Sequence, residues 1–564
     1  MYNKIFYLYK TLNNKIKKQF YYLQILIFLN SVLQLTVVFS VAPLVAVLSN
    51  NDEFIKKIYN IYDLSHLTRY EQVLLISLIS FIVFILANLS TAKIYIMQQK
   101  FCANISIFLS EVLFSKFINH NLKKKNQFHS SYYKSIIEHD IVSFANKIVF
   151  PIIDLNSKII PLIIIVFSIF LINASASIVI FVFLSLGYFL VYKFVKKKLN
   201  NNSLIVSNSN YQINKLLLDT FNSIIEVKIF SFQSYLIKKF NIQKTQVSNA
   251  LCDNMILSNT PRFFFEILAY GTVLIFIFYQ VHFTKNYNNT LTYTAIYITA
   301  GYKIMPYLQS ILFGFSMVKG TAGSLNRIYL AIKERSNKKS EISFNKIEKV
   351  ELKNFSYSYN GFEVFKNSNV EFNSNQIIGI YGESGCGKTT LANIILGYLK
   401  IKKGSIKVNN KIIDNNKFNL FNKASYVPQK INLLNENITE NITFKNNITN
   451  KDKNILIDIL HTTQLHKFVS KNKILKIKIN ENNKNISGGQ AQRIAIARAL
   501  YKKSDIIIFD EFTSNIDSET EKKIFYNLKT IFKGKIIIII THNEKLKKYC
   551  SKIYKIKNNQ LYEC

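Results

Sequence analysis

One stretch decides the fold of this 564-residue chain: Ser487-Gly488-Gly489-Gln490, followed by the apolar run Ile506-Ile507-Ile508-Phe509 and the acidic pair Asp510-Glu511. Upstream lies a complete G-x-x-x-x-G-K-[ST] phosphate loop, Gly382-Glu383-Ser384-Gly385-Cys386-Gly387-Lys388-Thr389. Residues 377–381 before this loop are typical of a buried strand, and residues 390–395 after it are typical of a helix. This context predicts an α/β nucleotide-binding domain.

The phosphate loop carries the groups that bind phosphate. Its glycines let backbone N–H groups wrap the phosphates, and the helix N-terminus adds the positive end of its dipole. We expect Lys388 to reach the β- and γ-phosphates and the Thr389 hydroxyl to ligate Mg²⁺. The predicted phosphate-binding residues are Gly382, Glu383, Ser384, Gly385, Cys386, Gly387, Lys388, Thr389 and Thr390.

The acidic pair follows a segment that is typical of a parallel strand covered on both faces. Its two carboxylates have different predicted roles. Asp510 is expected to hold the Mg²⁺ shell, and Glu511 is expected to polarise the attacking water as a general base. A strand capped by acidic turn residues explains either carboxylate alone, but it explains both together poorly after a phosphate loop.

In this order the motifs resemble those of the ATP-binding cassette (ABC) family. The resemblance implies that His542, after the strand-like segment 536–540, contacts the γ-phosphate. It implies that Gln429 touches both the metal and the nucleophile, and that Tyr359 stacks on adenine. Tyr357, one pleat away, is the alternative to Tyr359. The predicted catalytic residues are therefore Glu511, His542 and Gln429, and the predicted metal ligands are Thr389, Gln429 and Asp510.

The resemblance also implies that one cassette cannot form a complete ATP site. A signature segment at a helix N-terminus would close on the γ-phosphate bound to a second cassette. That segment consists of Ser487, Gly488, Gly489 and Gln490.

The region before about Gly320 carries the apolar surplus of the chain, in stretches long enough to cross a membrane, which takes about 20 residues each. Lysines concentrate before the first stretch and in the two long connections, so the positive-inside rule places both termini and the cassette in the cytoplasm. We expect a multi-pass protein of the cytoplasmic (inner) membrane with six spans: Phe20–Leu48, Val73–Met97, Ile148–Ile172, Ala174–Val195, Phe263–His282 and Leu291–Val318.

Two domains follow from this division. Residues 1–335 are predicted to form an α-helical polytopic membrane domain with two long cytoplasmic loops. Residues 346–564 are predicted to form an α/β P-loop NTPase cassette, and 336–345 to link the two.

The formal net charge of +39 suggests nucleic acid as a partner. No module that combines aromatic and basic residues for such recognition is present in the sequence, so we expect no nucleic-acid partner. The five cysteines are scattered without metal-ligand spacing. The predicted cofactors are ATP and Mg²⁺.

Six spans followed by one cassette resemble the half-size ABC exporters, and this resemblance covers the whole chain. It implies a homodimer, with a heterodimer as the alternative. Two membrane segments and the surroundings of Pro43 are similar to PglK-type flippases of lipid-linked oligosaccharides; the segments are 261–266 and 301–306. The expected substrate is a lipid-linked oligosaccharide or another amphipathic lipid or glycan. A general peptide, lipid or drug exporter and an exporter-fold importer remain alternatives.

Charged residues accompany the last predicted spans. Arg262 and Glu266 are four residues apart on one helix, and Lys303 lies inside an apolar stretch. Charges in membrane helices are costly and usually face a polar cavity or a partner. Two interpretations stay open: a cationic surface for a pyrophosphate headgroup, and a structural pair between Lys303 and Glu266.

Overall fold

The computed structural model shows two compact units. One comprises Met1–His120 and Lys124–Ser336, and the other is built mainly from Asn337–Cys564. The predicted linker 336–345 lies largely outside the described residues. The structure describes residues 1–564 except 49–67, 120–129, 173–197, 200, 261–262, 265, 268–269, 272–273, 275–277, 279–286, 334–343, 360, 416–417, 467–477, 481–484, 514–515 and 543.

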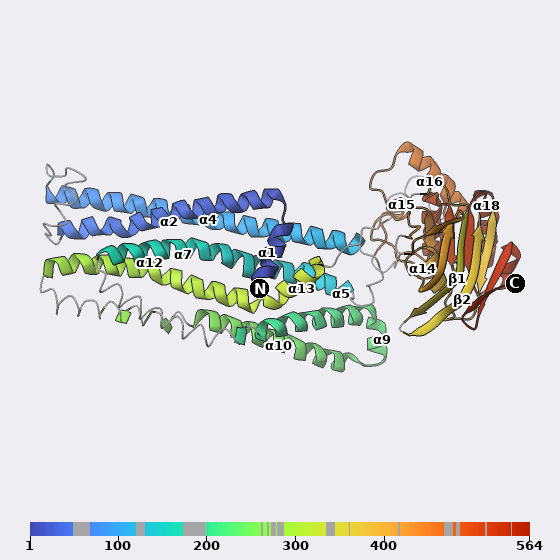
Figure 1. The fold of residues 1–564 in the computed structure, drawn as a ribbon, viewed down its shortest axis with the longest axis horizontal. Coiled ribbons are helices and arrows are strands. Elements are labelled where there is room, and N and C mark those ends of the chain that lie inside the picture. Colours follow the sequence, from blue (N-terminus) through green and yellow to red (C-terminus); the bar gives the residue numbers. More distant parts are fainter. Residues whose placement is uncertain are drawn as a thin grey trace. The chain divides into compact units, whose positions relative to one another are not determined.

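Long helices make up the first unit, and Figure 1 shows α2, α4, α7 and α12 side by side. Short π-helical turns, η2 and η3, interrupt the chain before α7. A further helix covers 201–222. The named elements are α1 (Tyr2–Thr11), α2 (Asn14–Leu48), α4 (Arg69–Asn119), α5 (Ser130–Ser135), η2 (Ile136–Asp140), α6 (Ile141–Phe144), η3 (Ala145–Val149), α7 (Phe150–Ile172), α9 (Ile224–Ile229), α10 (Gln233–Asn259), α12 (Tyr287–Gly320) and α13 (Ala322–Lys333).

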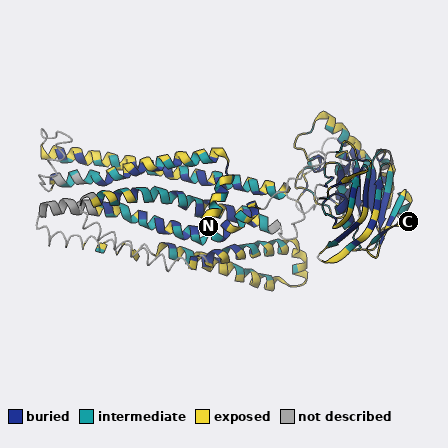
Figure 2. Cartoon of the chain, viewed as in Figure 1, coloured by how far each residue is buried: buried dark blue, intermediate teal, exposed yellow. Residues whose placement is uncertain are grey.

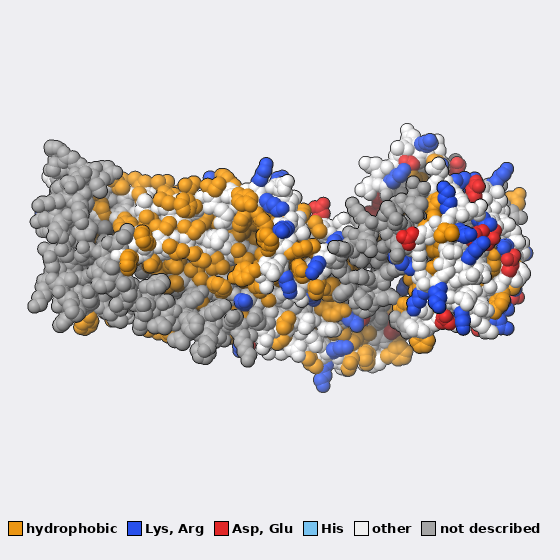
Figure 3. All heavy atoms as spheres, in the orientation of Figure 1, with side chains coloured by type: hydrophobic (Ala, Val, Ile, Leu, Met, Phe, Trp, Pro, Cys, Tyr) orange, Lys and Arg blue, Asp and Glu red, His pale blue; other side chains and the backbone are white. Residues whose placement is uncertain are grey.

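Three helical stretches among the described residues are long and apolar enough to cross a membrane: Asn14–Val45, Arg69–Ile118 and Tyr132–Phe170. They overlap the first three predicted spans. The most apolar window of Arg69–Ile118 has a mean hydropathy of 2.6, yet only 11% of it is buried. Figure 3 shows hydrophobic side chains covering the visible face of these helices. An apolar helix that leaves its side chains exposed is suited to contact with lipid.

The other three predicted spans are described less completely. The span 174–195 lies outside the described residues, and so does most of the span 263–282. The span 291–318 lies within α12. The predicted fold class, a helical membrane domain joined to an α/β cassette, agrees with these elements.

Two sheets form the second unit. An antiparallel sheet has the order β2-β1-β4-β5, and a six-stranded sheet has the order β10-β9-β3-β8-β7-β6, with parallel pairing from β9 to β6. The strands are β1 (Lys349–Tyr359), β2 (Phe362–Asn373), β3 (Gln376–Tyr381), β4 (Lys403–Val408), β5 (Lys411–Ile413), β6 (Ala424–Val427), β7 (Ile506–Asp510), β8 (Ile536–Ile540), β9 (Lys552–Lys557) and β10 (Gln560–Glu563).

The helices of this unit begin and end at residues that the sequence marks. Gly387 caps α14, and Ser487 and Thr449 cap α17 and α16 with capping boxes. The helices are α14 (Lys388–Ile395), α15 (Ile438–Thr443), α16 (Asn450–Thr462), α17 (Gly488–Tyr501), α18 (Ser518–Ile531) and the 3₁₀ helix η6 (Glu544–Tyr549).

The central strands β7 and β8 are buried on both faces, as Figure 2 shows in dark blue. Their composition explains this, because parallel strands covered on both sides are near-continuous runs of β-branched apolar residues. β3, β8, β7 and β6 are neighbours and run parallel. Their carboxyl ends therefore meet at one edge of the sheet, where open α/β sheets bind ligands.

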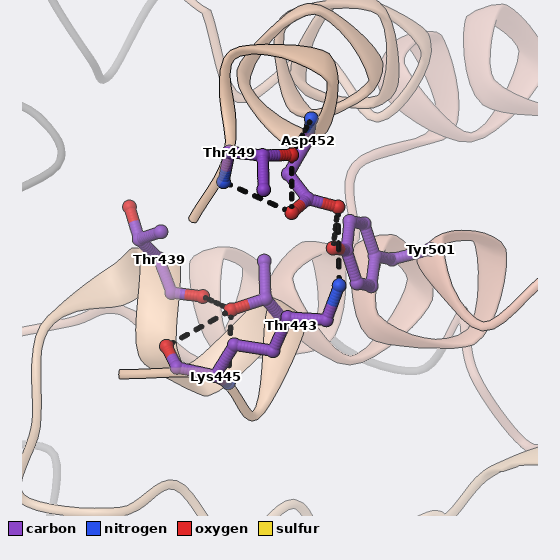
Figure 4. Close-up of polar contacts among 6 residues, drawn as sticks. All are labelled: Thr439, Thr443, Lys445, Thr449, Asp452 and Tyr501. Atoms are coloured by element: carbon purple, nitrogen blue, oxygen red, sulfur yellow. Dashed lines mark hydrogen bonds and ion pairs between the residues drawn. The ribbon is translucent and has the colours of Figure 1, made fainter. Parts of the chain in front are cut away.

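Polar contacts tie the C-terminal end of α17 to the helices that precede it (Figure 4). The Tyr501 hydroxyl donates to Asp452 Oδ1 at 2.6 Å, and Lys445 Nζ donates to the same oxygen at 3.1 Å. Asp452 Oδ2 accepts from the backbone N–H and the hydroxyl of Thr449. The hydrogen bonds, with Tyr501 first, hold the pKa of Asp452 well below its usual range. α17 is thus fixed at both ends, by this cluster and by its own capping box.

Thr449→Ala is expected to lower the stability of the cassette by about 1 kcal/mol, because α16 loses its N-cap. For a domain of this size that corresponds to a melting temperature lower by about 2–4 °C. Differential scanning calorimetry of the full chain measures it. Thr462→Ala is the matched control, since the partly exposed Thr462 donates its hydroxyl to Asp458 O within α16 and, in the described part of the chain, makes no other side-chain hydrogen bond. Equal shifts in the two variants would contradict the capping role.

Candidate functional site

The phosphate loop joins β3 to α14 and needs glycine where its backbone turns. Gly387 has φ +104°, and a Cβ built there would lie 2.7 Å from Val364 Cγ1. Lys388 is buried, and its Nζ donates to the carbonyl oxygens of Gly382 and Glu383 at 2.8 Å each. The predicted phosphate-binding residues therefore form one continuous segment, a loop that runs into the first turn of α14, with the ammonium group held against the loop.

Asp510 lies at the carboxyl end of β7, beside the first turn of α14. Thr389 Oγ1 donates to Asp510 Oδ2 at 2.9 Å, and the Tyr426 hydroxyl donates to the same oxygen at 2.8 Å. Burial raises the pKa of the Asp510 carboxyl, and the hydrogen bonds from Tyr426 and Thr389 oppose that rise. Burial and then the nearby Asp510 raise the pKa of Tyr426, so its hydroxyl remains a donor.

Glu511 contacts the two other predicted catalytic side chains. Gln429 Nε2 donates to Glu511 Oε2 at 2.5 Å, and His542 Nδ1 lies 3.2 Å from Glu511 Oε1. The backbone of Glu511 has φ +46°, a left-handed conformation that is strained for a residue with a side chain. The Glu511 N–H donates to Ile540 O of β8 at 2.9 Å, which holds this conformation. Strands β6, β7 and β8 thus bring Gln429, Glu511 and His542 together.

The two candidate adenine aromatics differ in exposure. Tyr357 is 9% exposed, whereas Tyr359 is 46% exposed at the end of β1. Burial also raises the pKa of Tyr357. Tyr359 is therefore the more exposed of the two candidate rings.

The signature segment lies at the start of α17, and its first and last residues are hydrogen-bonded to each other. Ser487 Oγ accepts from the Gln490 N–H at 3.2 Å, and the Ser487 N–H donates to Gln490 Oε1 at 2.8 Å. Among the described residues, no hydrogen bond joins Ser487, Gly488, Gly489 or Gln490 to the phosphate loop of the same chain. Ser487 and Gly488, at the N-terminal end of α17, are exposed.

Oxygen ligands suit Mg²⁺, and the predicted metal ligands supply oxygen. Thr389 offers a hydroxyl whose hydrogen is donated to Asp510, so its lone pairs remain available. Gln429 uses Nε2 toward Glu511, which leaves its carbonyl oxygen. The donor set therefore fits the metal.

One site residue was missed by the sequence analysis. Tyr426 precedes Gln429 by three residues, and its hydroxyl contacts Asp510. The only local signal is its place in the Tyr426-Val427-Pro428-Gln429 segment at the end of β6.

In the helical unit, the predicted charges are described in part. Arg262 lies outside the described residues. Lys303 Nζ donates to Gln34 Oε1 of α2 at 3.0 Å and lies 5.3 Å from the centre of the Phe84 ring. Gln34 also donates to Thr91 Oγ1 of α4 at 2.9 Å. The acceptor that Lys303 reaches among the described residues is thus Gln34, and not Glu266.

Comparison with known proteins agrees with this geometry. Residues 365–514 match the ABC transporter family. A putative export ATP-binding/permease protein of Rickettsia bellii is 30% identical over 364 residues, which is 62% of this chain and 60% of that protein. One of Rickettsia felis is 36% identical over 198 residues, 34% of each chain. An ATP-dependent lipid A-core flippase of Syntrophus aciditrophicus is 29% identical over 287 residues, 50% of this chain and 43% of that protein.

The matches to the first curated relatives thus span only about a third of their length. A solved structure shows the similarity of the whole chain. The structure of a bacterial Atm1-family ABC exporter with ATP bound aligns with a TM-score of 0.81 and covers 98% of this chain and 95% of that one. At 16% identity this similarity concerns the fold.

Proposed function

We propose that the chain is an ATP hydrolase coupled to transport. It has the fold of an ABC exporter, and its cassette brings five candidate side chains to one sheet edge: Thr389, Asp510, Gln429, Glu511 and His542. It exports or flips a substrate across the cytoplasmic membrane. The observation that carries the proposal is the position of Glu511 between Gln429 and His542, next to the carboxylate that the Thr389 hydroxyl contacts.

Hydrolysis uses the groups of this edge in distinct roles. Lys388 and the loop N–H groups bind the β- and γ-phosphates, and Tyr359 stacks on the adenine. Thr389, Gln429 and Asp510 would hold Mg²⁺, which would neutralise charge on the phosphate oxygens. Glu511 accepts the proton of the attacking water, and the Gln429 amide and the His542 ring hold its carboxylate toward that water. The left-handed backbone conformation of Glu511 restricts the orientation of its side chain.

A second copy of the chain completes each site. The signature segment makes no hydrogen bond to its own phosphate loop in the described chain, and the free N-terminus of α17 is suited to an anion. We therefore infer a homodimer in which Ser487, Gly488, Gly489 and Gln490 close on the nucleotide of the partner.

The proposed substrate is a lipid-linked oligosaccharide or a related glycolipid. Three observations support it: the similarity of membrane segments to PglK-type flippases, relatives that are named lipid A-core flippases, and a lysine inside the bundle. The Lys303 ammonium has a neutral partner in Gln34, so its charge can be matched by an anionic headgroup. A general exporter is the second candidate, because other relatives are named only as export proteins.

Lys303→Gln and Arg262→Gln are expected to leave basal ATP hydrolysis near that of the wild type. Each should weaken stimulation by a lipid-linked glycan about tenfold or more, since a lost hydrogen bond to a charged group costs about 1.5–3 kcal/mol. The measurement is ATPase activity and flipping in proteoliposomes as the glycan lipid is titrated.

Lys93→Gln is the matched control, because Lys93 is exposed on α4. If Lys303 only supports the fold, Lys303→Gln should lower melting temperature and basal ATPase activity together. Unchanged flipping in both variants would contradict headgroup binding. Failure of the wild-type chain to move any glycolipid, with ATPase activity intact, would favour the general exporter.

A further inference from the structure

Tyr426 contacts the site through the oxygen that Thr389 also uses. The two hydroxyls, one from β6 and one from α14, converge on Asp510 Oδ2 at 2.8 and 2.9 Å. A carboxylate held by two donors on one oxygen has little freedom to rotate. The other oxygen, Oδ1, is then held in one orientation. It accepts no hydrogen bond among the described residues, so it would be able to accept one from a water bound to Mg²⁺.

The strand register explains why Tyr426 reaches this carboxylate. Tyr426 pairs with Ile508 in the parallel β6–β7 ladder. Because alternate residues of a strand share a face, Ile508 and Asp510 lie on the same face of β7. Tyr426 is partly buried and packs on that face, against the core cluster that contains Leu391 and Ala392 of α14. Its side chain therefore extends along the sheet, about two residues, to the strand end.

We propose that Tyr426 is a positioning residue for Mg²⁺, acting through Asp510 and Thr389. By holding Asp510 Oδ2, its hydroxyl keeps the Asp510 carboxylate where it can accept the Thr389 hydrogen. The Thr389 lone pairs would then be available to hold Mg²⁺. This inference rests on the proposed ATP hydrolysis and assigns a residue to it that the motifs do not contain.

The packing of Tyr426 separates this role from a structural one. Tyr398 packs against the same core cluster, half-buried, with its ring 4.6 Å from that of Phe421. Among the described residues its hydroxyl makes no hydrogen bond. Tyr398→Phe therefore removes a hydroxyl from the same environment without touching Asp510, and it is the matched control for Tyr426→Phe.

The test uses Mn²⁺ as a spectroscopic probe of the metal position. Full-length wild type, Tyr426→Phe and Tyr398→Phe are reconstituted in lipid nanodiscs with a non-hydrolysable ATP analogue, and bound Mn²⁺ is measured by electron paramagnetic resonance. Loss of an outer partner of a metal ligand typically costs about 10–100-fold in metal affinity. We expect that loss in Tyr426→Phe and wild-type affinity in Tyr398→Phe. Nucleotide binding in EDTA and the metal-free melting temperature should be equal in the two variants.

The same preparations give a kinetic readout. The Mg²⁺ concentration for half-maximal ATPase activity should rise in Tyr426→Phe, while the rate at saturating Mg²⁺ stays close to that of the wild type. Wild-type Mn²⁺ affinity in Tyr426→Phe, or an equal loss in Tyr398→Phe, would overturn the positioning role and leave the proposed function standing. A wild-type chain that binds no Mn²⁺ with nucleotide would overturn both.

Discussion

Glu511→Gln is expected to bind ATP as the wild type does and to hydrolyse it about 10²–10⁴-fold more slowly. Glutamine has nearly the same shape and can keep the contacts to Gln429 and His542, which lie 2.5 and 3.2 Å from the carboxylate oxygens. It has no basic oxygen that can take the proton of water. The change therefore removes the chemical step and leaves the binding surface.

Two measurements on the purified, reconstituted chain check this result. Equilibrium binding of a fluorescent ATP analogue should be unchanged, and phosphate release should fall to the residual rate. Glu519→Gln is the matched control, because Glu519 pairs with Lys523 on the surface of α18. This variant should hydrolyse ATP at the wild-type rate. Near-wild-type turnover in Glu511→Gln would contradict the assignment of Glu511 as the general base.

Mixed dimers of Ser487→Arg chains and Lys388→Ala chains are expected to recover activity that both parent homodimers lack. If the signature segment acts on the partner's nucleotide, the mixed dimer has one site with an intact phosphate loop and an intact signature. Its other site carries both defects. We therefore expect up to about half of the wild-type rate if the two sites work independently, against almost none in either homodimer.

The control places the same two substitutions on one chain. A dimer of the double variant Ser487→Arg/Lys388→Ala with a wild-type chain has one defect in each composite site, so it should be inactive. Dimers of defined composition come from co-expression with two tags and purification on both. If the signature acted within its own chain, the two results would be exchanged.

Most of the cassette site was predictable because its residues follow strand ends. Asp510 comes directly after an apolar run, His542 stands one residue past another, and Lys388 follows the loop that leaves a third. Parallel neighbours bring such strand ends together. Tyr426 was not predictable in the same way. Its role depends on β6 lying next to β7 with Tyr426 opposite Ile508, and the sequence does not state which strands are neighbours.

Exposure decided a second point that the sequence left open. The alternation of β1 placed Tyr357 and Tyr359 on one face and could not separate them. The structure separates their exposure: a register shift lies between Tyr357 and Ser358, and beyond it Tyr359 is exposed whereas Tyr357 is buried. In the helical unit, hydropathy predicted the long helices. The π-helical turns η2 and η3 carry no comparable signal in Ile136–Val149.

Strand β8 consists of five consecutive isoleucines, all fully buried. Burial alone cannot distinguish one alignment of such a homopolymer from another, since each slide along β7 places isoleucine against the same neighbours. The flanks of the strand oppose a slide. The charged Lys535 would have to enter the core, and the buried Thr541 would have to give up the position where its N–H donates to Ile380 O. The number of isoleucines therefore sets how far along the strand His542 lies from Lys535. A sixth isoleucine inserted into β8 would still be an apolar residue in an apolar core, yet it would displace the His542 imidazole from Glu511. For the site, the length of this segment therefore matters more than which apolar residues compose it.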